Sequence, residues 1–333
     1  GEREVEMESF DPEEYWKIKA NLEVLDNNIE ASLTHYNGEK VDKFSFKNEE
    51  DAKKVTESFK GQNFKFTDIT KKPASRNPDA PFSTSTLQQT ASSIFGFGAS
   101  RTMQIAQRLF QGVEIDGETT GLITYIRTDS TDLSKEAIHS YRDFIQNNFN
   151  SSYLPEEIRS FKSKKAKNAQ EAHEGIRPTD ILRKPEEMKK YLDEDGYKLY
   201  NLIWKRSLAS QMSSASFERT AISISSENET IKLRANGSIQ TFDGFLNIYS
   251  EFNKKPETIE SEDNEDDKDL PSITLNDSID NIKPASSQHY TLPPPRYSEA
   301  TLVKKLEELG IGRPSTYASI ISVLKIRNYV EVE

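Results

Sequence analysis

The chain has 333 residues, with 55 acidic and 44 basic side chains, which gives a net charge of −11. This length allows two or three domains with their own cores, and the lack of cysteine excludes disulfides and thiolate metal sites within these residues. Apolar runs stay far below the roughly 20 residues that cross a bilayer, and the acidic start has no signal-peptide core. The sequence therefore predicts a cytoplasmic protein.

The acidity is concentrated in two segments. Residues 1–30 hold ten acidic and three basic side chains, and residues 251–270 hold nine acidic and three basic ones. Residues 159–183 are locally positive, with seven Lys or Arg side chains against three acids. Because the distribution of charge matters more than its sum, the composition does not exclude a nucleic-acid partner.

The first part of the chain is predicted to be rich in strands. Between residues 14 and 70, apolar and polar residues alternate, and Asn37-Gly38 is typical of a hairpin turn. The alternation is clearest at Trp16, Ile18, Ala20, Leu22 and Val24. A short helix is expected over 49–60. The three prolines within 71–82 predict a loop and a domain boundary.

A mainly helical part is expected next. Serines that precede apolar residues at helical spacing predict helices that begin after Ser85, Ser100 and Ser134, the second of which ends at Gly112. Another helix is expected over 186–212.

Strand-like alternation returns further along the chain. It occurs at 219–224, 230–235 and 241–249, which suggests that the chain re-enters the first β-rich domain. The charged run 253–269 has few apolar residues and is predicted to be mobile.

The last part of the chain predicts a helix over 298–309, a turn, a second helix opened by Pro314, and a strand over 329–332. This order resembles a winged helix-turn-helix. Because many small helical proteins have the same order without binding DNA, the pattern alone does not assign a function.

Residues 121–132 carry the strongest chemical signal. Leu122 and Ile123 predict a strand that ends at Tyr125, and Arg127 would point to the same side of an extended segment. A tyrosine hydroxyl can attack a phosphodiester while a guanidinium grips the non-bridging oxygens. Since a phenol is almost fully protonated at neutral pH, it needs nearby positive charge or a metal. The alternative is an ordinary packed tyrosine followed by a turn.

The segment Ile123-Thr-Tyr-Ile-Arg-Thr-Asp-Ser130 resembles the active-site motif of type IA DNA topoisomerases, in the version of bacterial DNA topoisomerase I. Three further segments resemble the same family in the expected order, with Gly175 standing where alanine is usual. They are Ala80–Gln89 with Arg101–Phe110, Gln170–Asp180, and Pro294–Val303 through Gly310–Ile320. The chain is therefore identified as a member of this family.

The resemblance implies a mixed α and β, multidomain fold that forms part of the type IA topoisomerase toroid. Residues 1–80 would begin a β-rich arch domain, 81–212 would form the tyrosine-bearing domain, and 213–282 would complete the arch. Residues 283–333 would form a truncated, winged-helix-like segment that lines a single-strand groove.

The resemblance also implies the site residues. Tyr125 and Arg127 would be catalytic, and the residues expected to bind DNA are His173, Arg177, Arg296, Arg313, Ser315 and Thr316. The residues alone allow a structural interpretation of several of these. His173 and Arg177 would face the same way on a helical turn, where Glu171 and Glu174 could pair with Arg177. Ser315 and Thr316 could simply cap a helix, and Tyr317 is expected in the core.

The implied function is ATP-independent relaxation of negatively supercoiled DNA through a 5′-phosphotyrosine intermediate. The absence of a phosphate-binding loop motif agrees with ATP independence. Mg²⁺ would be held by a TOPRIM domain that this sequence lacks, so the fragment is expected to bind single-stranded DNA but to cleave it poorly. We also expect a monomer without a membrane partner.

Two rival functions differ in class. A non-catalytic winged-helix DNA-binding module would be indifferent to Tyr125→Phe. A tyrosine recombinase would carry its tyrosine near the C-terminus, whereas Tyr125 lies in the middle of the chain.

Overall fold

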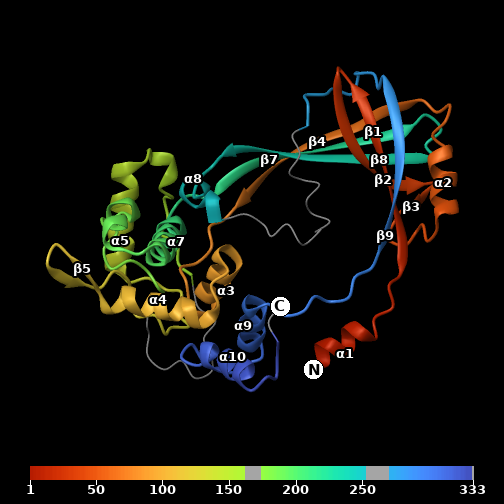
Figure 1. Ribbon diagram of the computed structural model, residues 1–333. Coiled ribbons are helices and arrows are strands. Elements are labelled where there is room, and N and C mark those ends of the chain that lie inside the picture. Colours follow the sequence, from red (N-terminus) through yellow and green to blue (C-terminus); the bar gives the residue numbers. More distant parts are fainter. Residues whose placement is uncertain (162–173, 253–269, 332–333) are drawn as a thin grey trace. The chain divides into compact units, whose positions relative to one another are not determined.

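A computed structural model describes residues 1–161, 174–252 and 270–331 (Figure 1). His173 and the run 253–269 lie outside the described residues. The chain passes between two compact units more than once. Unit 1 consists of residues 1–75, 216–242 and 258–296, and unit 2 of residues 76–215, 243–257 and 297–333. The predicted return of the chain to a β-rich region after residue 212 is thus seen in unit 1, whereas the assignment of 1–80, 81–212, 213–282 and 283–333 to family domains stays a prediction.

Unit 1 is built on an antiparallel sheet. Within the described ranges the strand order is β4-β7-β8-β2-β1-β9, with β3 paired to β2. The strands are β1 (Glu14–Val24), β2 (Asn27–Tyr36), β3 (Glu39–Lys40), β4 (Phe64–Arg76), β7 (Ala215–Ser226), β8 (Ile231–Phe242) and β9 (Asn281–Tyr290). The Asn37-Gly38 turn joins β2 and β3 as predicted, with both residues at positive φ.

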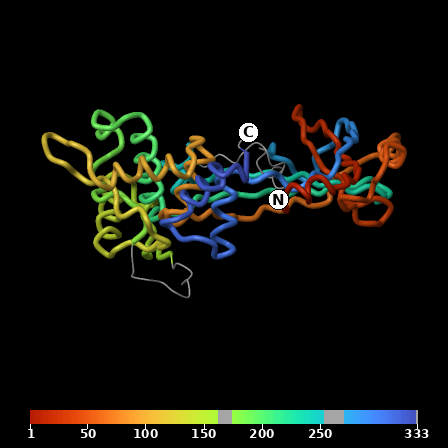
Figure 2. The backbone as a smooth tube through the Cα atoms, turned by 60° about the horizontal axis from the view of Figure 1, so that its bottom comes forward, coloured from red at the N-terminus to blue at the C-terminus, as the bar shows by residue number. Residues whose placement is uncertain are grey.

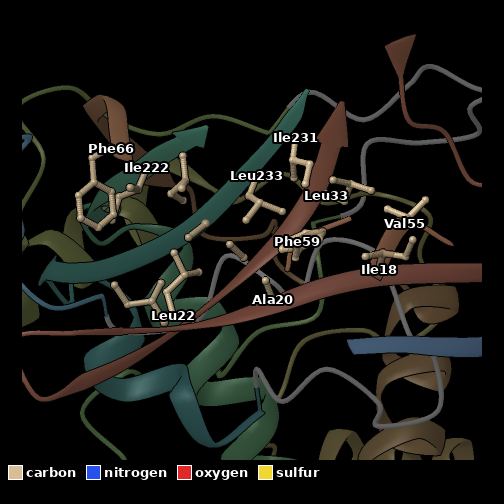
Figure 3. Packing of buried hydrophobic residues seen from close by; sticks show 14 of the residues in the cluster. Ile18, Ala20, Leu22, Leu33, Val55, Phe59, Phe66, Ile222, Ile231 and Leu233 are labelled. Carbon is tan, nitrogen blue, oxygen red and sulfur yellow. The ribbon is translucent and has the colours of Figure 1, made fainter. Parts of the chain in front are cut away.

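The core of unit 1 lies on one face of this sheet. Alternate residues of the strands are buried there, and helix α2 (Glu49–Glu57) contributes Ala52 and Val55 (Figure 3). Since side chains alternate between the two faces of a strand, the residues between the buried ones form a second, polar face. The short helix α1 (Glu2–Glu8) also belongs to this unit.

Unit 2 is mainly helical. Its α-helices are α3 (Thr84–Phe95), α4 (Ala99–Gln111), α5 (Lys135–Asn148), α6 (Pro185–Met188), α7 (Glu194–Ser210), α8 (Leu246–Tyr249), α9 (Glu299–Glu308) and α10 (Tyr317–Ile326). Short 3₁₀ turns are η1 (Ser151–Tyr153), η2 (Lys189–Tyr191) and η3 (Ser250–Phe252), and β5 (Val113–Ile115) pairs with β6 (Glu118–Thr120). The mixed α and β fold predicted from sequence is confirmed.

Several helix starts differ from the prediction. Ser134 caps α5 as expected, but Ser83 caps α3 in a reciprocal pair with Thr86, which places Ser85 inside the helix. Helix α4 begins after Gly98 rather than Ser100. Pro314 lies in the turn before α10, which begins after Thr316. In each of these helices the true start lies within three residues of the predicted one.

The predicted strands show larger differences. Residues 243–249 form a turn and α8 instead of a strand, and residues 329–331 form no strand. The predicted helix over 186–212 is broken before α7, where Asp193 accepts from the Gly196 N–H and starts a new helix. Residues 283–290, which the sequence placed in the helical segment, belong to β9. Most of the residues of β9 are polar and exposed, which is possible because β9 lies at the edge of the sheet.

The helix pair α9–α10 packs against α3 and α4 in both views (Figures 1 and 2). Ser85 Oγ donates to Glu307 Oε2 at 2.5 Å, and the Ala99 N–H donates to Glu299 Oε2 at 2.6 Å. The apolar contact includes Tyr317, which is buried as predicted. It comprises Ala99, Val303, Leu306, Tyr317 and Ile321. These contacts place residues 314–319 near Ile126 and Arg127, which follow Tyr125 in the chain.

Candidate active site and nucleic-acid groove

The tyrosine segment is extended, although it is not the strand that the sequence predicts. Ile123 makes a single bridge to Pro178, and no ladder continues from it. From residue 125 to residue 130, exposed and buried side chains nevertheless alternate strictly, with Tyr125 and Arg127 exposed and Ile126 buried. Tyr125 and Arg127 therefore point to the same side, as expected for extended backbone. Tyr125 as a whole is 41% exposed.

Two packing contacts hold this segment in place. The Tyr125 ring lies edge-on to Phe110 at a centroid distance of 5.5 Å. Behind the segment, fully buried Thr84 donates its hydroxyl to the Ile126 carbonyl at 2.7 Å and accepts the Thr128 N–H at 2.9 Å. The Thr84 N–H in turn donates to the Thr128 carbonyl at 2.9 Å. Thr84 thus clamps the backbone on both sides of Arg127.

We expect Thr84→Val, which keeps the shape of the side chain, to lower the free energy of unfolding by about 1–3 kcal/mol. The change leaves the Ile126 carbonyl and the Thr128 N–H buried without this partner. Chemical denaturation of the chain measures the effect. Thr102→Val is the matched control, because the Thr102 hydroxyl bonds only to the backbone of residues 97 and 98 beside its own helix. An equal loss in both variants would contradict the clamp.

A second motif segment, 174–179, packs along the tyrosine segment. The Thr124 hydroxyl donates to the Gly175 carbonyl at 2.9 Å and accepts the Arg177 N–H at 3.0 Å. The Thr124 N–H donates to the Arg177 carbonyl at 2.9 Å. Phe82 also bridges to Ile176, so the structure brings three of the four motif segments together in one hydrogen-bonded cluster.

Arg177 lies in this cluster but not on a helical turn, because residues 174–178 are extended. Its side chain is 14% exposed and pairs with Glu174, with Nε–Oε2 and Nη2–Oε1 distances of 2.5 and 3.2 Å. Burial acts to raise the pKa of Glu174, but hydrogen bonds from Arg177 and the Ser134 N–H outweigh it and hold this pKa below 4.5. The structure therefore shows Arg177 in an ion pair with Glu174, which is the structural interpretation of this arginine. A contact of Arg177 with phosphate stays a prediction.

We expect Glu174→Gln to lower the free energy of unfolding at pH 7 by about 1–3 kcal/mol, because it leaves a largely buried guanidinium without its counter-charge. A carboxylate with a depressed pKa stabilises the fold above its unfolded pKa and loses this effect as pH falls through its folded pKa. The difference between wild type and variant should therefore be constant above about pH 5 and shrink below pH 4.5.

Denaturation series between pH 7 and the acid limit of folding measure this difference. Glu194→Gln is the control, because Glu194 is 80% exposed and pairs with Lys198 on the surface of α7. Its effect should stay within about 0.5 kcal/mol at every pH. A difference for Glu174→Gln that does not shrink in acid would contradict the assigned role of the ion pair.

A groove of about 770 Å³ runs beside Arg127 within unit 2. One side is formed by α4 and the other by the start of α10, and Ser315 lies on the latter side. The lining residues are Arg101, Met103, Gln104, Ile105, Gln107, Arg108, Ile126, Arg127, Asp195, Pro314, Ser315, Ala318 and Ser319. The structure thus brings two predicted site residues, Arg127 and Ser315, to the same groove.

Charge pairing distinguishes the arginines of this groove. Arg101 donates to Asp195 at 2.5 Å, and Arg108 donates to Asp193 at 2.8 Å. Arg127 makes no ion pair or side-chain hydrogen bond with any residue that the structure describes. Of the three arginines, Arg127 is the one whose charge is not balanced by a described carboxylate.

The remaining predicted residues are placed as follows. The Arg313 guanidinium donates to the Gly312 carbonyl at 2.7 Å, and the Thr316 hydroxyl accepts the Arg313 N–H at 2.8 Å. Thr316 therefore stabilises the turn before α10. Arg296 belongs to unit 1, where it pairs with Glu4 at 3.0 Å. His173 lies outside the described residues.

Two groove residues were not predicted. Arg101 and Arg108 are seven residues apart on α4, with Gln104 between them, and this spacing alone places them on one helix face. The motif segment Arg101–Phe110, which contains both arginines, resembles the family, but no groove was predicted from the spacing of its polar residues.

Three other tyrosines of unit 2 are unsuited to act as a nucleophile. Burial raises the pKa of Tyr141 to about 12, and burial also raises the pKa values of Tyr200 and Tyr249. All three phenols are buried, whereas Tyr125 is exposed beside an arginine without a described carboxylate partner. This contrast favours Tyr125 over these three residues as the reactive phenol.

Among the described residues, no group of three or more His, Cys, Asp or Glu side chains is arranged to hold a metal ion. These residues therefore do not fit a magnesium site. No helix within the described ranges is long and apolar enough to span a membrane.

A family model described as DNA topoisomerase matches residues 1–333. The chain belongs to the type IA DNA topoisomerase family. The family predicted from the four motif segments is thereby confirmed.

The relatives of this topoisomerase chain are bacterial. DNA topoisomerase 1 of Rickettsia felis is 50% identical over 333 residues, and the protein of the same name from Zymomonas mobilis is 42% identical over 339 residues. Both matches cover the whole chain, which spans 42% and 26% of these relatives. Full-length topoisomerase I from Thermotoga maritima has a similar structure, with a TM-score of 0.80, 33% identity, and coverage of all of this chain and 50% of that one.

Proposed function

We propose that this chain forms the tyrosine-bearing part of an enzyme that relaxes negatively supercoiled DNA by transient cleavage of one strand. The observation that carries the proposal is the side-by-side exposure of Tyr125 and Arg127, where Arg127 lines a groove without a described carboxylate partner. A phosphodiester fits this arrangement, because it offers an electrophilic phosphorus to the phenol and two non-bridging oxygens to the guanidinium.

The reaction exchanges one ester for another. The Tyr125 oxygen attacks phosphorus and the bond from phosphorus to the 3′ oxygen breaks, so that the 5′ end is joined to the tyrosine. The phenol proton is lost, and the departing 3′ oxygen gains a proton to become a hydroxyl. Arg127 would stabilise the charge that builds on the non-bridging oxygens, a role worth about 10²–10³ in rate. Attack by the 3′ hydroxyl reverses the exchange.

By family resemblance, a single strand is the form of DNA proposed for this groove. It is lined by cations, amides and the hydroxyls of Ser315 and Ser319, which are donors suited to a phosphate backbone. His173, Arg177, Arg296, Arg313 and Thr316 are proposed as further DNA contacts by family resemblance. Because Arg101 and Arg108 are paired with aspartates, a phosphate would have to compete for them.

The remaining properties of the enzyme are proposals of the same kind. Mg²⁺ would be held by a TOPRIM domain. The phosphotyrosine ester conserves the energy of the broken bond, so religation would require no ATP. We also propose that the enzyme acts as a cytoplasmic monomer, and that this chain alone binds single-stranded DNA but cleaves it poorly.

A chimaera tests the proposal. The matched 333 residues of the Rickettsia felis enzyme are replaced by this chain, and negatively supercoiled plasmid is incubated with the chimaera and Mg²⁺ without ATP. We expect topoisomers that relax in steps of one linking number. A folded chimaera that binds single-stranded DNA without relaxing the plasmid would contradict the proposed function.

A further inference from the structure

The sheet of unit 1 has a polar face opposite its core, here called the open face. Its register is fixed by the strand pairing: Lys19 lies opposite Ser32, Ser32 opposite Arg234, and Arg234 opposite Ser223. The neighbouring positions Ala20, Ala31 and Leu233 point into the core. One row of the open face therefore runs across four strands, and Arg219 lies further along β7, opposite Ser238.

A cavity of about 350 Å³ lies on this face over β4, β7 and β8. It is lined by Asp68, Thr70, Lys72, Arg219, Thr220, Ala221, Ser223, Arg234, Asn236 and Gly237. Three of these side chains are cations and one is an anion, while the threonines, Ser223 and Asn236 add hydrogen-bond donors. Arg234 Nε donates to Asn236 Oδ1 at 3.0 Å, which orients the guanidinium along β8.

This positive cluster is not a consequence of composition. Residues 1–75 and 216–242, which supply most of unit 1, hold 20 acidic and 15 basic side chains. On the open face the balance is reversed around the cavity. Further along, Lys19 pairs with Glu30 at 3.0 Å and Lys283 pairs with Glu23 at 2.8 Å. Around the cavity over β4, β7 and β8, three cationic side chains accompany one carboxylate.

We propose that the open face binds the phosphate backbone of duplex DNA. Arginine presents a planar fork of donors that matches phosphate oxygens, and lysine adds a point charge. Nonspecific single-strand binders stack bases on aromatic rings, but none of the ten lining residues is aromatic. A surface of cations and hydroxyls without rings is suited to the outside of a duplex. This contact is separate from the tyrosine chemistry and does not depend on it.

The test compares Arg219→Ala/Arg234→Ala with the unchanged 333-residue chain. Fluorescence anisotropy measures the affinity for a duplex of about 20 base pairs, and for an oligothymidylate of similar length, across a salt series. We expect duplex affinity to fall roughly tenfold, and the salt slope to become shallower by about 1.8, because two phosphate contacts are lost. Oligothymidylate affinity should stay within about twofold, because the Arg127 groove is unchanged.

Lys53→Ala/Lys60→Ala is the matched control, since it removes two exposed cations at and beyond α2, the helix on the core side of the sheet. Unchanged duplex binding in the arginine variant, or an equal loss in the lysine control, would overturn the proposal. A loss confined to oligothymidylate would overturn the choice of duplex. Failure of plasmid relaxation in the chimaera would instead contradict the proposed function and leave this binding result intact.

Discussion

Tyr125→Phe should abolish plasmid relaxation by the chimaera, with a loss on the order of 10⁴-fold or more, because no other group replaces a missing nucleophile. The substitution keeps the ring, and therefore the edge-on contact with Phe110 at 5.5 Å. Unfolding free energy and binding of oligothymidylate should change little. The measurement is the initial rate of relaxation at saturating enzyme, followed by agarose gel electrophoresis.

Tyr191→Phe is the matched control for this loss. Tyr191 donates its hydroxyl to Asp116 at 2.6 Å near β5, and it does not line the Arg127 groove. Its removal deletes the same single oxygen, so the relaxation rate should stay within about twofold. Relaxation that survives in Tyr125→Phe at the wild-type rate would show that a residue other than Tyr125 is the nucleophile.

Arg127→Ala should lower the rate of strand cleavage by about 10²–10³ while leaving the fold intact. The reason is that Arg127 is exposed and makes no described ion pair, so its removal leaves no buried charge without a partner. Arg127→Lys should recover only part of the rate, since an ammonium cannot form the bidentate contact. Rapid-quench cleavage of an end-labelled single strand at saturating chimaera measures the chemical step apart from binding.

Arg108→Ala is the control within the same groove. Arg108 is already neutralised by Asp193 at 2.8 Å, so its removal should weaken DNA binding only slightly and leave the cleavage rate nearly unchanged. If Arg108→Ala and Arg127→Ala slowed cleavage equally, the lack of a described carboxylate partner would not explain the role of Arg127 in cleavage. Loss of affinity without loss of rate in Arg127→Ala would reduce its role to DNA binding.

The sequence predicted the local features of this site better than its long-range contacts. Alternation around Tyr125 follows from extended backbone, and the cap of α5 follows from Ser134 alone. The ladder at Ile123 ends after one bridge because the next donors bond elsewhere. The Leu122 N–H donates to the Leu109 carbonyl, and the Arg177 N–H donates to the Thr124 hydroxyl. Thr84 clamps backbone 42 and 44 residues away, and no periodic pattern encodes such a contact.

Long-range contacts also explain why two features of unit 1, strand β9 and the open face, were not predicted from the sequence. Strand β9 contains Pro284 and a run of small polar residues, a composition that an edge strand tolerates but that predicts no strand by itself. The cationic open face unites Lys72, Arg219 and Arg234 from three strands, and only the register brings them together. The family motifs identified the tyrosine segment, whereas the groove and the open face required the fold.

Covalent trapping tests directly whether Tyr125 is the nucleophile. The chain is incubated with a single-stranded oligonucleotide and Mg²⁺, with and without a separately produced TOPRIM domain that binds it, and is then denatured. We expect an adduct that forms only with the added domain, carries the 5′ end of the cleaved strand, and maps by mass spectrometry to Tyr125. An adduct on another residue, or none although the two parts associate, would contradict the assignment of Tyr125 as the nucleophile.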